Sequence, residues 1–152
     1  MKLKVLWVGK TRDPWVKEAV DEYAGRIRRY APLELVEARE EKGAEPSEQQ
    51  RRECERLEKL ISPHATVVIL DETGEQMTSP GLASFMGKQR DSGIGELVFV
   101  IGGAYGFTDE FRRRGKLLAL SKMTFTHQMV RAFLLEQVYR AFTILNNEPY
   151  HH

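Results

Sequence analysis

ELVFVIGGAYGF, residues 96–107, contains five consecutive large apolar residues followed by two glycines. An apolar run without alternating polar residues is typical of a strand buried on both faces, as the central strands of a parallel sheet are. Glycines directly after it predict a tight turn, because no side chain limits the backbone there. The stretch therefore predicts the centre of a parallel sheet, with a glycine turn at its carboxyl edge.

Four other short runs rich in Val, Ile and Leu predict further strands, at residues 2–8, 33–38, 65–71 and 116–121. Helical patterns lie between them. Strands that alternate with helices along the chain indicate an α/β fold, with one mainly parallel sheet covered by helices on both faces. Ligands of such sheets bind at the carboxyl ends of the strands, so the loops after the strands are the place to look for a site.

The helix starts are marked by capping residues. Asp13-Pro14 and Ser79-Pro80 each combine a capping side chain with a proline suited to the first helical position. Ser47 and Gln50 form a capping box, and Thr108 opens a short helix. The last helix, roughly 128–146, has an apolar stripe that we expect to face a core or a partner: Val130, Phe133, Leu134, Val138, Ala141, Phe142 and Leu145.

Length and composition suit one domain spanning residues 1–152. The sequence is 41% hydrophobic and 30% charged, and no apolar segment approaches the length of a membrane span. The amino-terminal stretch MKLKVLWVGK predicts a first strand and not a signal peptide, so we expect a cytoplasmic protein. Cys54 is the single cysteine, which excludes an internal disulfide, and nothing in the sequence predicts a metal site.

Charge is unevenly distributed along the chain. Residues 1–30 carry a net charge of +4, residues 31–75 carry −6 and residues 76–152 carry +3. The basic residues cluster in RIRRY (Arg26, Arg28, Arg29) and RRRGK (Arg112, Arg113, Arg114, Lys116). Each cluster alone is typical of a solvated helix face, and an RNA-binding surface needs both on one side of the molecule.

Three loops follow strands that we expect to be neighbours in the sheet: 70–74, 101–106 and 121–126. The third loop, SKMTFT, has few groups that bind phosphate, but it offers backbone N–H and C=O groups beside apolar walls, which suits an adenine-like ring. The glycines at 102, 103 and 106 lack the following Gly-Lys-Ser/Thr of a phosphate-binding P-loop. Two alternatives remain for them, a plain strand-to-helix turn and an anion nest of a phosphate-ester hydrolase.

The sequence resembles the ribosomal large-subunit pseudouridine methyltransferase H family (RlmH) of the SPOUT superfamily. Four motifs carry the resemblance, in this order: IGGAYGF, LSKMTFTHQMVR, LLEQVYRAF and the terminal EPYHH. The resemblance implies a carboxyl-terminal trefoil knot, here roughly 66–152, with S-adenosyl-L-methionine bound in the knotted loops. The residues that it assigns to the cofactor are Leu70, Gly102, Leu120, Ser121, Lys122, Met123, Thr124 and Phe125, with Asp71 and Gly103 beside them.

The same resemblance implies methylation of N3 of a pseudouridine in 23S ribosomal RNA, near the decoding site of the assembled ribosome. It assigns the catalytic roles to Arg140, Tyr150 and His151. Histidine suits proton abstraction at neutral pH, tyrosine can stack on a flipped base, and arginine can hold a phosphate or an imide anion. The structural alternatives are a surface charge for Arg140, a packing anchor for Tyr150 and a frayed tail or purification tag for His151 and His152.

The resemblance also implies a homodimer, and we expect the tail of one subunit to complete the site of the other, because the short tail has no obvious packing partner in the sequence. His127 is interpreted either as a loop-orienting residue or as a satisfied buried histidine, and His64 as part of a surface turn. A different class of protein remains open, a ribosome-binding or assembly factor that keeps the fold without the activity.

Overall fold

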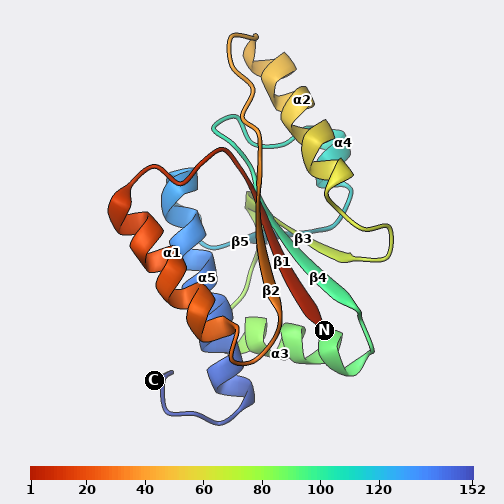
Figure 1. The fold of residues 1–152 in the computed structure, drawn as a ribbon. Coiled ribbons are helices and arrows are strands. Elements are labelled where there is room, and N and C mark those ends of the chain that lie inside the picture. Colours follow the sequence, from red (N-terminus) through yellow and green to blue (C-terminus); the bar gives the residue numbers. More distant parts are fainter.

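The computed structural model describes residues 1–152 and contains one five-stranded sheet (Figure 1). The strands are β1 (Lys2–Val8), β2 (Leu33–Ala38), β3 (Thr66–Gln76), β4 (Glu96–Ile101) and β5 (Lys116–Ala119). Their order across the sheet is β2-β1-β4-β3-β5, and every neighbouring pair is parallel. The predicted parallel α/β sheet is confirmed, and so is the adjacency of the strands that precede the three loops.

Five helices cover the sheet: α1 (Pro14–Ile27), α2 (Pro46–Lys59), α3 (Ser79–Asp91), α4 (Asp109–Arg112) and α5 (His127–Leu145). Two separate cores show which face each helix covers. Leu3, Val5 and Trp7 of β1 pack with α1, α3 and α5 in the larger core. Leu6 and Val8 point the other way and pack with α2 and α4. This alternation along one strand is what a sheet buried on both faces requires.

Two predicted helix starts are wrong by a residue or two. Helix α2 begins at Pro46 with Glu45 as its N-cap, so Ser47 lies inside the first turn and the predicted capping box does not form. In α3 the cap is Thr78, whose hydroxyl accepts a hydrogen bond from the backbone N–H of Gly81. In both helices a proline with a helical φ occupies one of the first two positions, and the cap precedes it. Thr108 caps α4 as predicted.

Strand β3 extends beyond its predicted end. Residues expected in a loop, Asp71 to Gly74, lie within the strand, and the pairing with β5 shifts between Leu70 and Glu75. At Gly74 a Cβ atom would come within 2.6 Å of the backbone of Leu117, so glycine is required for this close approach. The irregular end of β3 brings acidic residues to the carboxyl edge of the sheet.

The apolar stripe of α5 is largely buried in the chain's own core. Leu134, Val138, Ala141 and Phe142 are all buried there. Val130 and Leu145 are half-buried, and Phe133 has 39% of its surface exposed. The buried part of the stripe is therefore a core face, and it does not supply a contact with a second copy.

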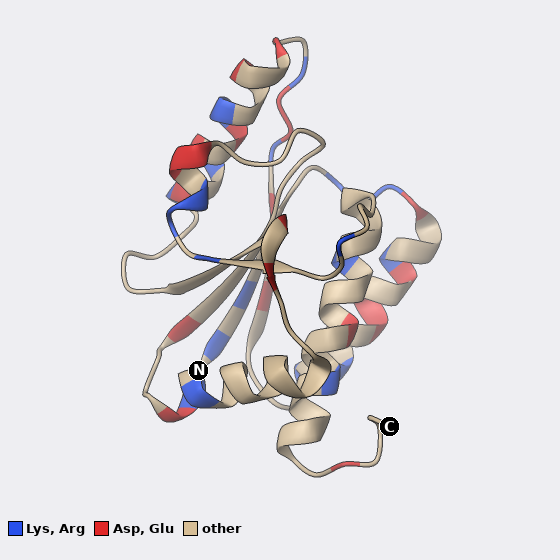
Figure 2. Ribbon diagram, turned by 180° about the vertical axis from the view of Figure 1, so that it is seen from behind, with Lys and Arg blue, Asp and Glu red and all other residues tan.

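The two basic clusters lie at opposite sides of the sheet. RIRRY ends α1 and leads into β2, whereas RRRGK leads into β5, and these are the two edge strands. Three of the four cations in RRRGK have acidic partners: Arg112 with Asp71, Arg114 with Glu58 and Lys116 with Glu75. The clusters therefore do not form one basic surface. Figure 2 shows basic and acidic residues intermixed along α2, where ion pairs link the charges.

Candidate active site

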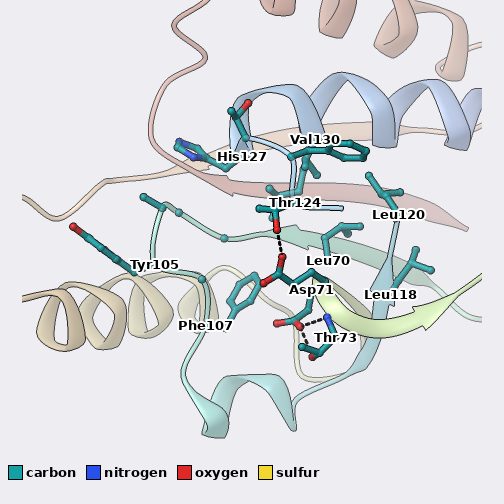
Figure 3. Close-up of a pocket in the computed structure, with 18 of the residues that line it drawn as sticks. Leu70, Asp71, Thr73, Tyr105, Phe107, Leu118, Leu120, Thr124, His127 and Val130 are labelled. Carbon is teal, nitrogen blue, oxygen red and sulfur yellow. Dashed lines mark hydrogen bonds between the residues drawn. The ribbon is translucent and has the colours of Figure 1, made fainter. Parts of the chain in front are cut away.

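A cavity of about 640 Å³ lies at the carboxyl ends of β4, β3 and β5 (Figure 3). The three loops singled out in the sequence line it together. Seven of the eight predicted cofactor residues are in its wall: Leu70, Gly102, Leu120, Ser121, Met123, Thr124 and Phe125. Asp71 and Gly103 line it too, whereas Lys122 is exposed to solvent outside the wall. The volume is typical of a small-molecule or cofactor site.

The glycines after β4 are held close to other groups. A Cβ atom on Gly102 would lie 3.0 to 3.2 Å from the ring of Phe107, which packs behind it. A Cβ atom on Gly103 would lie 2.8 Å from the carboxylate of Glu53. Gly106 has φ +69°, a conformation that favours glycine, and its N–H donates to the carbonyl of Gly103. The loop is thus a tight turn whose bare backbone forms a cavity wall.

The third loop contributes mainly backbone and apolar surface. Met123 is 75% exposed, and Phe125 packs edge-on against Phe133. The hydroxyl of Ser121 accepts a hydrogen bond from the N–H of Met123 at 3.0 Å, which fixes the turn. Thr126 caps α5 through the N–H of Met129. The uncharged loop therefore forms a wall that suits a flat, partly apolar ligand.

Acidic residues line the cavity beside this loop. The carboxylate of Asp71 accepts hydrogen bonds from the N–H and hydroxyl of Thr73 and lies 3.4 Å from Arg112, and that of Glu72 accepts from the hydroxyl of Thr124. Two carboxylates against one guanidinium favour a cationic ligand and repel phosphate. This arrangement weighs against the anion nest of a hydrolase. No cluster of three or more metal-binding side chains is present.

His127 is half-buried at the start of α5 and lines the same cavity. Burial, and then the nearby positive charge of Arg131, lower the pKa of its imidazole below the ordinary 6.5. The side chain is therefore neutral at pH 7. It offers the cavity an uncharged polar edge.

The predicted catalytic residues gather around Glu136, which sequence reasoning missed. Its Oε1 accepts hydrogen bonds from Nε of Arg140 at 3.1 Å and from the hydroxyl of Tyr150 at 3.0 Å. Nη1 of Arg140 lies 3.2 Å from Nδ1 of His151. The guanidinium also lies over the ring of Tyr150, which packs edge-on against Tyr139. The spacing of four residues between Glu136 and Arg140 on one helix was the available signal.

These contacts set the proton positions. Burial and hydrogen bonding raise the pKa of the Tyr150 phenol, so it stays protonated and donates to Glu136. Because an arginine can only donate, Nδ1 of His151 is the acceptor, and in the neutral ring Nε2 carries the proton. Arg140, Tyr150 and His151, the trio, therefore present hydrogen-bond donors, and His151 does not offer a free basic nitrogen in this arrangement.

None of the trio lines the first cavity. Arg140 and Glu136 line a second cavity of about 560 Å³, whose wall shares Leu118, Leu120 and Phe125 with the first. The tail packs against its own chain, where the hydroxyl of Tyr30 donates to both carboxylate oxygens of Glu148 at 2.7 Å. The expectation that the tail has no packing partner is therefore wrong. Tyr30, just beyond the end of α1, and Tyr139 of α5 supply that partner.

Comparison with known proteins agrees with this geometry. The family described as "Predicted SPOUT methyltransferase" matches residues 1–151. The chain belongs to the SPOUT methyltransferase family. A Pelobacter propionicus protein named "Ribosomal RNA large subunit methyltransferase H" is 74% identical over the full length of both chains. One of the same name from Geobacter metallireducens is 66% identical, over all of this chain and 99% of the relative. These relatives place this SPOUT protein in the large-subunit methyltransferase H branch.

A solved structure supports the fold of this SPOUT chain independently of close sequence likeness. The probable methylase family protein from Haemophilus influenzae matches with a TM-score of 0.58 at 12% identity, over 99% of this chain and 70% of its own. At that identity the likeness shows the fold alone. No helix of this SPOUT protein is both long and apolar enough to cross a membrane.

Proposed function

We propose that this protein is an S-adenosyl-L-methionine-dependent methyltransferase acting on large-subunit ribosomal RNA. Its target is N3 of a pseudouridine in 23S RNA near the decoding site, within the assembled ribosome. The full-length relatives are named for large-subunit RNA methylation, which supports the substrate class. The observation that carries the proposal is the cavity built from three strand-end loops, with bare backbone, apolar walls and two carboxylates. Because the proposed substrate is the ribosome, we also propose that the protein is located in the cytoplasm.

The cavity fits such a cofactor. Gly102 and the run Leu120 to Phe125 would hold the adenosine through backbone groups and apolar contacts, and Leu70 would pack against it. Asp71 and Glu72 provide negative charge for the cationic part of the molecule. When bound, the cofactor supplies an electrophilic methyl group on a sulfonium. The protein must then orient the acceptor and exclude water, and alignment is worth about 7 to 11 kcal/mol in favourable cases.

The acceptor nitrogen belongs to a weakly acidic imide, which reacts after losing its proton. The donors of the trio suit stabilisation of the resulting anion: the guanidinium of Arg140, and Nε2–H of His151 in the tautomer that its contact with Arg140 imposes. Tyr150 packs beneath Arg140 and donates to Glu136, so it orients the guanidinium and can stack on a base. We therefore assign the trio to stabilising the anion, and the imide proton passes to solvent before the methyl group is transferred.

We further propose a trefoil knot over roughly residues 66–152. We also propose a homodimer in which Arg140, Tyr150 and His151 of one subunit complete the cofactor cavity of the other. The shared site is supported by the separation of the two groups, since Arg140 faces the second cavity and no residue of the trio lines the first. Mixing a subunit truncated before Tyr150 with a Gly102-substituted subunit tests it. Activity recovered in the mixed dimers supports a shared site, and no recovery contradicts it.

The central experiment is methyl transfer from labelled S-adenosyl-L-methionine to ribosomes that lack the modification. Stripped ribosomal RNA is assayed in parallel, and the labelled nucleoside is identified after digestion. We expect N3-methylpseudouridine from ribosomes and little label from stripped RNA. Cofactor binding without incorporation into either substrate would contradict the proposed reaction and favour an assembly factor. Label in stripped RNA at an equal rate would contradict the requirement for the assembled ribosome.

A further inference from the structure

The loop between β1 and α1 is held rigidly against the start of α5 (Figure 1). Arg131 is fully buried and donates hydrogen bonds to the carbonyls of Val8 at 2.7 Å and Gly9 at 3.1 Å, and to the hydroxyl of Thr11 at 3.0 Å. Gln128 accepts from the N–H of Arg12 and donates to the carbonyl of Lys10. Two neighbouring residues of α5 thus fix the backbone of one exposed loop.

This rigid loop displays cationic and aromatic side chains to solvent. Lys10 is exposed and has no ion-pair partner, and the Arg12 side chain is 62% exposed although it pairs with Glu40 at 2.6 Å. Trp15, two residues beyond the N-cap of α1, is 56% exposed. Tryptophan is highly buried on average, so an exposed one on a fixed backbone beside two cations is unusual. Phosphate binding and base stacking both call for this combination.

The loop lies beside the cofactor cavity. Strand β1 is the neighbour of β4 in a parallel sheet, so their carboxyl ends meet at one edge. His127, next to Gln128, lines the cavity. On the other side of β1, the segment after β2 carries Arg39 and Lys42, both exposed and without ion-pair partners. Figure 2 shows, from behind, this β1–α1 loop passing the first turn of α5. Lys10, Arg39 and Lys42 therefore lie at the same edge of the sheet as the cavity, whereas RIRRY and RRRGK do not share a surface.

We propose that the segment Lys10–Trp15 is a docking surface for ribosomal RNA. Lys10 and Arg12 contact backbone phosphates, and Trp15 stacks on an unpaired base. Because Arg131 and Gln128 tie the segment to the helix that starts at the cavity, docking there sets the position of the target nucleotide relative to the cofactor. The inference rests on the proposed function. The competing occupant of an exposed tryptophan is a second copy of the chain, which the test separates.

The test measures equilibrium binding to bacterial ribosomes lacking the modification, at several KCl concentrations. The variants are Trp15→Ala, Trp15→Phe and the double variant Lys10→Ala/Arg12→Ala. Lys88→Ala, an exposed cation of α3 without an ion-pair partner, is the matched control. We expect Trp15→Ala to weaken binding about tenfold or more, and Trp15→Phe to retain most of the affinity. The double variant is expected to reduce the slope of log affinity against log salt by about 2.

Affinity for S-adenosyl-L-methionine and the sedimentation mass should stay at wild-type values in all variants. If the ribosome affinity and salt slope of the Trp15 and double variants match those of Lys88→Ala, the docking surface is overturned. A lower sedimentation mass for Trp15→Ala would also overturn it, by assigning Trp15 to a subunit interface. Failure of the proposed function is distinguishable, because wild-type protein would then bind no ribosomes or transfer no methyl group.

Discussion

Replacing Gly103 with alanine should strain the loop after β4 against a buried carboxylate. The new methyl group would lie 2.8 Å from Oε1 of Glu53 and 3.4 Å from a methyl of Val8. Glu53 is 1% exposed, and its Oε2 is held by the N–H of Glu41 at 3.1 Å and by Gln49 at 3.3 Å. The carboxylate therefore moves only by weakening these bonds. Overpacking of this kind costs about 1 to 3 kcal/mol.

Part of that cost is offset, because an alanine restricts the unfolded chain more than a glycine does, by about 0.4 to 1 kcal/mol where the native φ is allowed. Gly103 has no positive φ, so this gain applies. We expect a net loss of about 1 to 2 kcal/mol, or a Tm lower by about 2 to 8 °C for a chain of this length. Titration calorimetry with S-adenosyl-L-methionine should show weaker binding, because Gly103 lines the cavity.

A double-mutant cycle isolates the cause. In a Glu53→Ala background the clash is absent, so Gly103→Ala should lower the Tm little or not at all. Gly25→Ala is the matched control, since a Cβ there meets nothing within 4 Å, and an alanine in a helix interior should stabilise the protein by about 1 kcal/mol. An unchanged Tm for Gly103→Ala, or an equal loss with and without Glu53, would refute the reasoning.

Three further predictions concern the two cavities and the tail. Glu136→Gln should lower the rate of methyl transfer about tenfold or more, because its bonds to Arg140 and Tyr150 become weaker. Cofactor affinity should stay unchanged, because Glu136 lines only the second cavity. A parallel loss of cofactor affinity would contradict this prediction. Tyr30→Phe should loosen the tail at Glu148, which should lower the Tm by about 2 to 4 °C and slow methyl transfer. In the wild type, an ultraviolet titration should show the Tyr30 phenol ionising with a pKa of about 12. Because the folded-state pKa of His127 is lowered, the unfolded chain binds its proton more readily and stability falls as the pH drops below 6.5. His127→Gln should therefore flatten the dependence of Tm on pH between 6.5 and 5, and a profile parallel to the wild type would count against a neutral His127.

The fold followed from local patterns where burial dominates. The apolar runs of β3 and β4 predicted central parallel strands, and these strands are buried on both faces. Helix starts were less predictable, because a proline such as Pro46 can displace a capping pattern by one or two residues. The extension of β3 past Leu70 depends on close backbone contact between Gly74 and Leu117, which are 43 positions apart in sequence. No local pattern encodes that contact.

The sequence predicted which loops form the first cavity, but it did not predict where the buried charged side chains around it lie. Loops of bare backbone and apolar residues indicated the first cavity. Glu53, however, sits in a stretch that is typical of a solvated helix, and its burial depends on Gly103, which is 50 positions away in the sequence. Arg131 carried a usable signal. It stands three, four and seven positions before Leu134, Leu135 and Val138, on the face of α5 that is buried. A cation on a buried helical face predicts a structural tether.

The two cavities differ in charge in the sense that methyl transfer requires. The first has two carboxylates against one guanidinium and suits a sulfonium, whereas the second balances Arg140 against the single carboxylate of Glu136 and offers guanidinium donors to an imide anion. On the proposed reaction, both charges disappear as the methyl group moves. In the proposed dimer the first cavity of one subunit faces the second cavity of the other, and the apolar residues Leu118, Leu120 and Phe125 line both. Low polarity favours the loss of opposite charges. Replacing Leu120 with asparagine should therefore slow transfer more than it weakens cofactor binding, whereas Leu120→Met should leave both nearly unchanged. Equal losses of rate and affinity for the asparagine variant would show that the wall serves only to bind.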